Sequence, residues 1–211
     1  WIFHNYFDKY PVALPKCWGY FHKNGGVWKD TGEIFGFEDL PDIFKRMDGH
    51  KVVIKPIRGS SGARIVVADV CNEGNDVSLL ISGKKVPLTE FAKNFKKIHY
   101  IIEDRLLQHD DLNAIYPHAV NSVRINTLYD TRDVKLWGAI IKLGTHGAEI
   151  DNWGKGSLCV GIDMESGRLS TGSYDINFSQ KIIAPISFHP DTQVKFEGVL
   201  LPYWQELKDA V

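Results

Sequence analysis

The stretch VVIKPIRGSSGARIVV (residues 52–67) places two apolar runs, rich in β-branched residues, on either side of a short loop. Lys55 lies in the first run, and the loop carries Gly59, Ser60, Ser61 and Gly62. Small residues are typical of a hairpin tip. They also leave backbone N–H groups uncovered, so such a loop can wrap phosphate oxygens while a nearby ammonium balances their charge. The pattern is not a P-loop, because no Gly-Lys-Ser/Thr follows it. Both interpretations stay open on this stretch alone.

The composition of the chain narrows the class of protein. With 211 residues, 44% of them hydrophobic, the chain is long enough to bury a sizeable core. Its formal net charge of -1 provides no basic field for nucleic acid. The three cysteines, Cys17, Cys71 and Cys159, lack the paired spacing of a zinc site or a disulfide framework, which favours a reducing compartment. We expect a soluble cytoplasmic protein with no membrane span and no nucleic-acid partner.

Turn residues and apolar periodicity divide the chain into three parts. Residues 1–47 are interpreted as a partial N-terminal lobe, 48–103 as a small lobe with the glycine-rich loop, and 104–211 as a larger lobe. The chain starts at Trp1 and stops within a predicted amphipathic helix over 197–211. We therefore expect part of the native protein, at the C-terminal end in particular, to be missing.

The local patterns indicate mostly antiparallel strands with few helices. Strands are predicted at 52–57, 63–70 and 100–103, with a hairpin turn at Ser82 and Gly83 and a helix over 90–97 that Thr89 caps. A longer β region follows, with strands at 122–129, 134–143, 157–163 and 168–173. These patterns predict an α+β fold of two small lobes that share one site.

One predicted strand carries polar residues where a core strand would not. In NSVRINTL (residues 121–128), alternation puts Ser122, Arg124 and Asn126 on one face. Lys142 lies near the end of the next predicted strand. An arginine flanked by amide side chains favours phosphate or carboxylate binding. The alternative is an edge-strand arginine paired with a surface carboxylate.

Five ordered motifs carry a resemblance to a known family. They are the Lys55 strand with its Gly/Ser loop, IIEDRLLQH (101–109), NSVRINT (121–127), EIDNWGKGSLCVGIDMESGRL (149–169) and FHPDTQVKFEGVLLPYW (188–204). Together they resemble the ATP-grasp superfamily, and within it the sugar-transfer-associated branch related to α-L-glutamate ligases. The resemblance runs from about Val52 to the C-terminus. It implies two α+β lobes with antiparallel sheets that enclose a nucleotide cleft.

The resemblance implies a nucleotide site in which Lys55 contacts phosphates under the covering loop of Gly59, Ser60, Ser61 and Gly62. Glu103, Asp104 and Leu106 would belong to the hinge whose backbone edge reads adenine. Asp110 would hold the ribose. Lys55, Glu103 and Arg124 are accordingly expected to line one cleft.

The resemblance also implies a reacting centre. Arg124 and Lys142 would be the catalytic residues that face the γ-phosphate and the acyl-phosphate, while Asn121, Asp151 and Asn152 would meet substrate. ATP and Mg²⁺ are the implied cofactors, but no late acidic pair follows Arg168, so the metal ligands stay unassigned. Two departures are Lys142, where the branch more often has arginine, and Ser157 after Gly156, where a Gly-Gly pair is usual.

The implied activity is that of an ATP-dependent carboxylate-amine ligase. It would form an amide through an acyl-phosphate, and its partners would be a small-molecule carboxylate and an amine, with an amino acid added to a sugar or polysaccharide precursor. The incomplete chain is expected not to turn ATP over by itself. The alternatives are a non-catalytic nucleotide- or glycan-binding module and a purely structural α+β domain. His109 and His189 are interpreted as structural histidines rather than substrate ligands, and the oligomeric state stays open.

Overall fold

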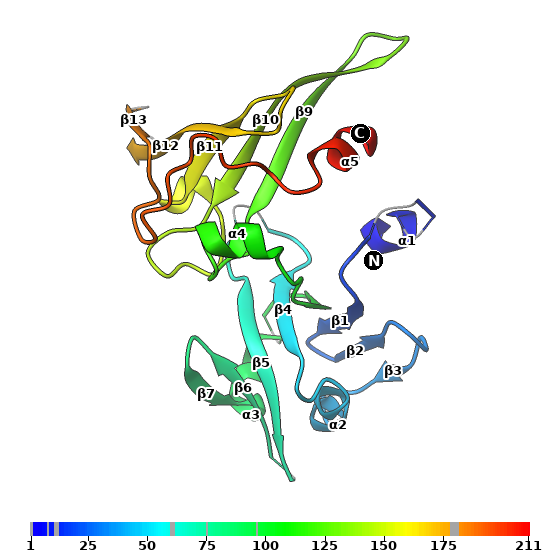
Figure 1. The fold of residues 1–211 in the computed structure, drawn as a ribbon. Helices are drawn as coiled ribbons and strands as arrows, with labels where there is room; N and C mark the ends of the chain where they lie inside the picture. The colour runs from blue at the N-terminus through cyan, green and yellow to red at the C-terminus, as the bar shows by residue number, and fades with distance from the viewer. Residues whose placement is uncertain are drawn as a thin grey trace. The chain divides into compact units, whose positions relative to one another are not determined.

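The computed structural model describes residues 2–7, 9–10, 13–59, 62–74, 76–95, 97–177 and 182–211. The chain forms two compact units, unit 1 (Trp1–Leu106) and unit 2 (Leu107–Val211), which Figure 1 draws with their elements labelled. Each unit contains one antiparallel sheet and short helices, which confirms the α+β class. The domain limits after residues 47 and 103 stay a prediction. Strands from both sides of residue 47 belong to the sheet of unit 1.

Unit 1 is built on an eight-stranded sheet with the order β3-β2-β1-β8-β4-β5-β6-β7. Its strands are β1 (Cys17–His22), β2 (Gly25–Trp28), β3 (Ile34–Phe35), β4 (Lys51–Pro56), β5 (Val66–Glu73), β6 (Asp76–Ile81), β7 (Lys84–Pro87) and β8 (Tyr100–Asp104). Its helices are α1 (Ile2–Phe7), α2 (Leu40–Lys45), α3 (Leu88–Phe91) and the short 3-10 helix η1 (Ala92–Asn94).

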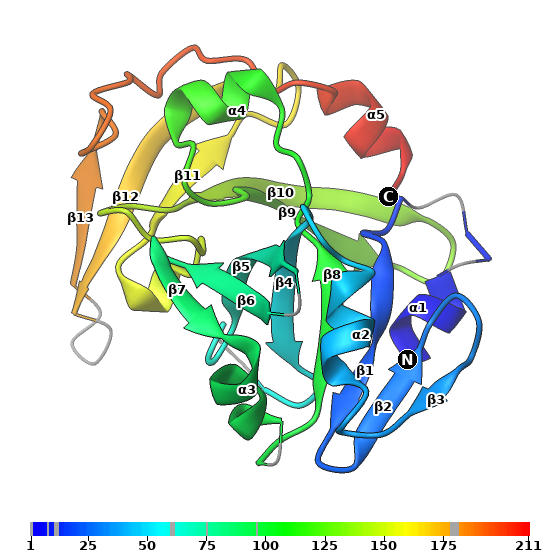
Figure 2. The ribbon, with the colours of Figure 1, turned by 90° about the horizontal axis from the view of Figure 1, so that it is seen from below.

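One face of this sheet is apolar, and α2 and α3 pack against it (Figure 2). Val52 and Ile54 of β4 are fully buried there, together with Ile102 of β8. Because side chains alternate along a strand, Lys55 and Glu103 lie on the opposite face. Burial of one face therefore fixes which residues the second face presents.

The local predictions in unit 1 had mixed outcomes. The turn between β6 and β7 is confirmed, since Ser82 and Gly83 both have positive φ (47° and 77°), as a type I′ turn requires. The helix predicted over 90–97 begins earlier, at the first residue of α3. Pro87 takes the N-cap position with ψ of 138°, so the prediction of Thr89 as the cap is wrong. Proline suits this junction because its fixed φ allows both an extended residue and a helix start.

Unit 2 contains a five-stranded sheet with the order β13-β12-β11-β10-β9. Its strands are β9 (Ser122–Tyr129), β10 (Val134–Leu143), β11 (Leu158–Ile162), β12 (Leu169–Asn177) and β13 (Ile182–Ile186). Its helices are α4 (Asp110–Ile115), η2 (Trp153–Lys155) and α5 (Trp204–Asp209). β9 and β10 match the predicted strands to the residue.

The helix predicted over 197–211 is much shorter than expected, because only α5 is helical. The residues before it run beside the start of β12, where the Leu201 N–H donates to the Gly167 carbonyl at 3.0 Å. Tyr203 then takes a left-handed conformation with φ of 56° directly before the helix. Pro202 precedes it, and a proline there is incompatible with a continuous helix interior. The apolar residues of 197–211 do recur at helical spacing, but they belong to an extended segment followed by a short helix.

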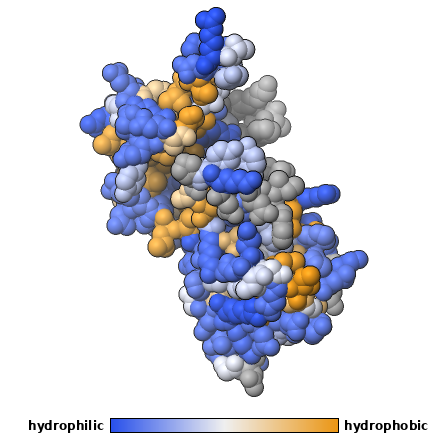
Figure 3. All heavy atoms as spheres, turned by 90° about the vertical axis from the view of Figure 1, so that its right-hand side faces the viewer, coloured by the Kyte–Doolittle hydropathy of each residue, from blue (hydrophilic) through white to orange (hydrophobic). Residues whose placement is uncertain are grey.

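The surface carries scattered apolar residues. On the face seen in Figure 3, hydrophobic atoms lie in patches between hydrophilic ones. Ile34, Leu107 and Trp137 are among the largely exposed apolar side chains. Single exposed apolar residues are normal on a folded protein. No helix among the described residues is both long and apolar enough to span a membrane.

Candidate functional site

The polar face of unit 1 brings together two of the predicted nucleotide-site residues. Lys55 is on β4 and Glu103 is on the neighbouring strand β8, where Val53 is the register partner of Glu103. The Lys55 ammonium forms an ion pair with Oε2 of Glu103. The lysine side chain is 39% exposed, whereas that of the glutamate is 5% exposed. The cation is therefore accessible, and its counter-ion is buried.

A third residue, His4, completes this cluster. Its Nε2 atom lies 2.6 Å from Oε1 of Glu103, and both side chains are 5% exposed. A buried carboxylate is costly unless partners satisfy both oxygens. Here one oxygen faces His4 and the other faces Lys55. The sequence offered no signal for His4, because 99 residues separate it from Glu103.

The predicted hinge residues have structural contacts of their own. Asp104 accepts a hydrogen bond from Nε1 of Trp18 at 2.6 Å and lies 3.2 Å from Nδ1 of His50. Its backbone N–H donates to the Lys16 carbonyl at 2.8 Å. Leu106, by contrast, is half-exposed. The Asp104 side chain thus anchors β8, and the adenine role predicted for this segment stays a prediction.

The predicted phosphate loop is described only at its ends. Gly59 is exposed, and Gly62 has a positive φ of 65°. Ser60 and Ser61 lie outside the described residues. A left-handed backbone conformation favours glycine. The backbone alone therefore explains a glycine at position 62, without any role in phosphate binding.

Unit 2 gathers a second polar group on one face of its sheet. Lys142 of β10 has Ser122 of β9 and Cys159 of β11 as register partners, which puts the three side chains on the same face. Asp151 joins them, because Nζ of Lys142 lies 3.6 Å from its Oδ2. Ser122 donates to the same carboxylate oxygen from its backbone N–H, at 2.8 Å, and from its hydroxyl. Asp151 therefore fixes the end of β9 beside Lys142.

Arg124 lies on the same face of the sheet, two residues after Ser122 on β9. It is exposed, and no carboxylate in the described part of unit 2 lies within ion-pair distance of it. Burial raises the pKa of the Cys159 thiol to about 11, while the positive charges of Lys142 and Arg124 act in the opposite direction. Both cations thus lie close enough to act on one buried thiol. This face presents positive charge that the described residues of the unit do not neutralise.

The remaining predicted residues of unit 2 are placed differently from one another. Asn121 is buried, with Nδ2 donating to the Tyr116 carbonyl at 2.9 Å and Oδ1 accepting from the Gly144 N–H at 3.1 Å. Its amide therefore holds loops together. Asn152 is half-buried directly before η2, and Asp110 is exposed as the first residue of α4. Their ligand roles stay predictions.

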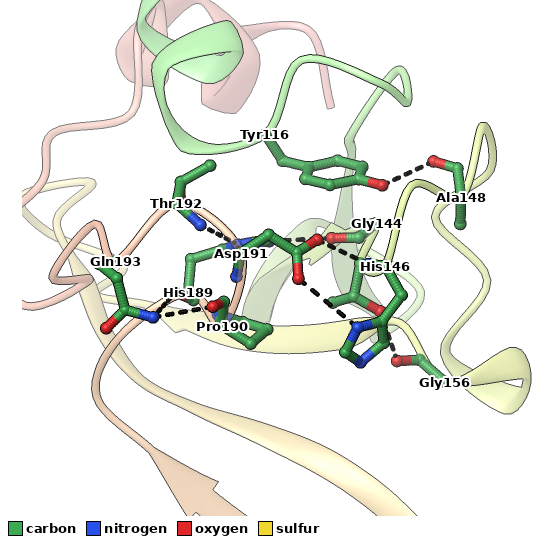
Figure 4. Close-up of polar contacts among 11 residues, drawn as sticks. Tyr116, Gly144, His146, Ala148, Gly156, His189, Pro190, Asp191, Thr192 and Gln193 are labelled. Atoms are coloured by element: carbon green, nitrogen blue, oxygen red, sulfur yellow. Dashed lines mark hydrogen bonds and ion pairs between the residues drawn. The ribbon is translucent and has the colours of Figure 1, made fainter.

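His189 occupies the polar cluster of Figure 4 and is fully buried. Its Nε2 lies 2.9 Å from the Gly144 carbonyl, and its Nδ1 accepts from the backbone N–H groups of Asp191 and Thr192 at 3.2 and 3.4 Å. This set requires the neutral imidazole with its proton on Nε2. Burial lowers the pKa of His189 accordingly. Its bonding matches that of a core histidine.

The His109 side chain also bonds to backbone, at the start of α4. It is the N-cap residue of α4, and its Nδ1 accepts from the Asp111 N–H at 3.2 Å. Histidine is not among the usual N-cap residues, so this role could not be predicted from the residue type.

The described residues contain no ready-made cluster of three or more metal ligands. No three His, Cys, Asp or Glu side chains among them gather into a group that could hold a metal. Asp151, the carboxylate on the cationic face, is already bonded to Ser122 and Lys142. Magnesium at nucleotide sites is commonly held by one or two carboxylates together with substrate phosphates, and its protein ligands here stay unassigned.

Two antiparallel α+β units are thus present, one with a lysine before a glycine-containing loop and the other with a cationic sheet face. The comparison with family models assigns a chain with this combination to the ATP-grasp class of nucleotide-binding proteins.

The model of the sugar-transfer associated ATP-grasp family matches residues 2–211, so the chain belongs to that family and the suspected branch is confirmed. A general ATP-grasp function follows at the level of the family, that of an ATP-binding, ligase-type enzyme. Searches of curated proteins and of solved structures found no match.

Proposed function

We propose that the protein is an ATP-dependent carboxylate-amine ligase that adds an amino acid to a sugar or polysaccharide precursor in the cytoplasm. The observation that supports this most is the cationic face of unit 2 in a member of the ATP-grasp family. ATP would supply the phosphoryl group that activates the carboxylate. The residues of this chain would bind the nucleotide and the two substrates, and would stabilise negative charge as it spreads in the transition state.

In the proposed site, Lys55 binds phosphate oxygens, and the loop that contains Gly59 and Gly62 covers them. Arg124 and Lys142 stabilise the transferring phosphoryl group. Asp151 is a positioning residue for Lys142 as well as a candidate substrate ligand, because its carboxylate lies beside both the ammonium and the Ser122 hydroxyl.

Four further assignments complete the proposal. The backbone near Glu103, Asp104 and Leu106 reads adenine, and Asp110 holds the ribose. Asn152, beside Asp151 in sequence, contacts substrate. Asn121 contacts substrate as well, and for this its amide must exchange its bonds to Tyr116 and Gly144.

Calorimetric ATP binding tests the nucleotide half of this proposal. Lys55→Ala should weaken ATP binding by about 10- to 100-fold, because it removes one charge-assisted contact of roughly 1.5–3 kcal/mol. Lys84→Ala is the matched control, since Lys84 is an exposed lysine of β7 in the same unit. An equal effect of the two substitutions would count against the assignment of Lys55.

Phosphate release tests the catalytic half. The protein would be assayed with ATP, magnesium and a panel of amino acids with amino sugars or uronic acids. Phosphate release that depends on one acid and one amine together supports the ligase. ATP binding without such release favours the alternative of a non-catalytic nucleotide-binding module.

A further inference from the structure

A pocket of about 460 Å³ opens in unit 1 where the strands β5, β6 and β7 lie side by side. Glu73, the last residue of β5, and Asp76, the first residue of β6, both line it, and Ser78 follows on β6. Pro87, directly before α3, and Pro41 of α2 supply apolar wall. None of the five family motifs lies here. A volume of this size accommodates a small molecule.

The polar lining residues have their side chains on one face of the sheet. Side chains alternate along β6, so positions 76, 78 and 80 point to the same side, and their register partners on β5 and β7 point there with them. Val77 and Leu79 point to the other side, where they belong to the apolar core. The register pairs concerned are Glu73 with Asp76, Ser78 with Pro87, and Leu80 with Lys85.

The Ser78 hydroxyl is the unusual group of this pocket. Ser78 is 5% exposed, and its Oγ atom is buried without a hydrogen-bond partner among the described residues. A hydroxyl that is removed from water without a partner costs free energy, so most buried hydroxyls are bonded. An unbonded hydroxyl beside a pocket therefore indicates a place where a polar group of a ligand can bind.

An ion pair between Lys85 and Glu73 crosses this hydroxyl. The two residues are on β7 and β5, so their side chains meet over β6, which separates those strands. Along β6, Ser78 lies between the register positions of the two residues. Nζ of Lys85 lies 2.5 Å from Oε2 of Glu73, and the side chains are 50% and 68% exposed. An ion pair this exposed is weak and can open, which would uncover Ser78.

Asp76 adds a carboxylate that is not neutralised. It is exposed, and no cation in the described part of the chain lies within ion-pair distance of it. Because Lys85 is already paired with Glu73, the described lining has one net negative charge. Lys84 is the register partner of Ile81 and points to the opposite face, so it does not offset this charge at close range.

These groups match a primary ammonium better than a metal ion. An ammonium has three N–H donors, and Glu73, Asp76 and Ser78 each offer an acceptor. Calcium takes about six to eight oxygen ligands, whereas no group of three or more acidic, histidine or cysteine side chains gathers among the described residues. Leu88 adds to the apolar wall that the two prolines provide for the carbon body of a ligand.

We propose that this pocket binds a small organic molecule that carries a primary ammonium group. The ammonium bonds to the carboxylates of Asp76 and Glu73 and to the Ser78 hydroxyl. The Lys85 ammonium, which occupies part of this position in the free protein, moves out to solvent as the ligand binds. This site depends neither on ATP nor on the ligase activity proposed above.

A matched pair of ligands tests the proposal directly. Cyclohexylamine and cyclohexanol have the same ring, and at pH 7 only the first carries an ammonium. In ligand-observed NMR titrations without ATP, we expect the amine to bind at least about 5-fold more tightly, because only it makes charge-assisted contacts. Equal binding of the two, or no binding of the amine, overturns the proposal. Displacement of the amine by calcium at concentrations below the Kd of the amine also overturns it.

Two substitutions should change the amine affinity in opposite directions. Asp76→Asn should weaken it by about 5-fold or more, and Lys85→Met should strengthen it by about 3-fold or more because the ligand no longer competes with the Lys85 ammonium. Asp30→Asn, at a half-exposed carboxylate of the same unit that does not line this pocket, should leave it unchanged. Unchanged binding in the Asp76→Asn variant, or no gain in the Lys85→Met variant, contradicts the assignment.

Ser78→Ala tests whether the hydroxyl binds the ligand or only fills space. In the free protein the Tm should stay the same or rise, because the substitution removes a buried hydroxyl that has no partner. The amine affinity of the same variant should fall by about 3-fold or more. A lower Tm with unchanged amine affinity would show that the hydroxyl is structural and would overturn its assigned contact. Thermal unfolding of every variant also verifies that it is folded.

ATP binding to the same variants separates this proposal from the preceding one. Asp76→Asn should leave ATP affinity unchanged, because Asp76 is not one of the predicted nucleotide ligands. A protein that binds the amine in this manner but does not bind ATP supports the pocket and contradicts the ligase. A protein that binds ATP but not the amine contradicts the pocket alone.

Discussion

The cations of the two units differ in what surrounds them. In unit 1, Lys55 is paired with Glu103, a buried carboxylate that His4 also contacts. In unit 2, Arg124 is exposed on its strand without a carboxylate partner among the described residues of that unit. A paired lysine must exchange its partner before it can bind a phosphate, whereas the arginine needs no such exchange. The two cations that we propose to bind phosphate therefore differ in whether a carboxylate must first be displaced.

The largest effect is expected at the unpaired cation. Arg124→Met should weaken ATP binding by about 100-fold and leave AMP binding nearly unchanged, because the residue is proposed to face the γ-phosphate. Its effect should exceed that of Lys55→Ala, since loss of the lysine also removes its competing pair with Glu103. Calorimetry with both nucleotides measures this. Arg132→Met, in the exposed turn between β9 and β10, serves as the control. Equal weakening of ATP and AMP would contradict the proposed contact.

Replacing Glu103 should free the Lys55 ammonium from its ion pair. Glu103→Gln is expected to lower the free energy of unfolding by about 1–3 kcal/mol, because it removes a charged acceptor from a buried cluster. The same variant should bind ATP a few-fold more tightly, since the Lys55 ammonium no longer has a competing carboxylate. Denaturant unfolding and calorimetry measure the two effects. Weaker ATP binding by a folded variant would show that Glu103 positions the lysine rather than competing for it.

The smallest expected effect is a loss of folding stability at acid pH, which we assign to a residue of unit 2. The folded pKa of His189 is lowered from its ordinary value near 6.5, so the unfolded chain binds more protons in the window below that value. The stability from neutral His189 is therefore present above about pH 6.5 and is lost as pH falls toward the folded pKa. Thermal unfolding from about pH 7.5 to about pH 5.5 should show a drop of a few degrees.

Two variants identify the responsible histidine. His189→Gln should flatten this pH dependence, because glutamine can still donate to the Gly144 carbonyl but does not titrate. His146→Gln should retain it, since the His146 side chain is 73% exposed. An unchanged pH profile in the His189→Gln variant would assign the acid sensitivity to other groups.

Much of the fold could be predicted where local pattern and burial agree. Polar and apolar residues alternate over 122–126 at the start of β9, and Asp130 with its neighbours marks the turn before β10; the limits of both strands were correct. The alternation also predicted that Ser122 and Arg124 share a face. The helix over 197–211 failed because apolar spacing alone does not distinguish a helix from an extended segment that packs beside β12.

The sequence by itself determined the family, the antiparallel α+β class and the charged side chains that the strands present on their polar faces. These depend on residue order and on periodicity, which are local properties. Only the tertiary structure decided which of those charges are neutralised. The pairing of Glu103 with His4, the fixing of Lys142 by Asp151 and the pairing of Glu73 with Lys85 across β6 all join residues from different elements. Electrostatic energy depends on distance and burial, and neither is encoded by spacing along the chain.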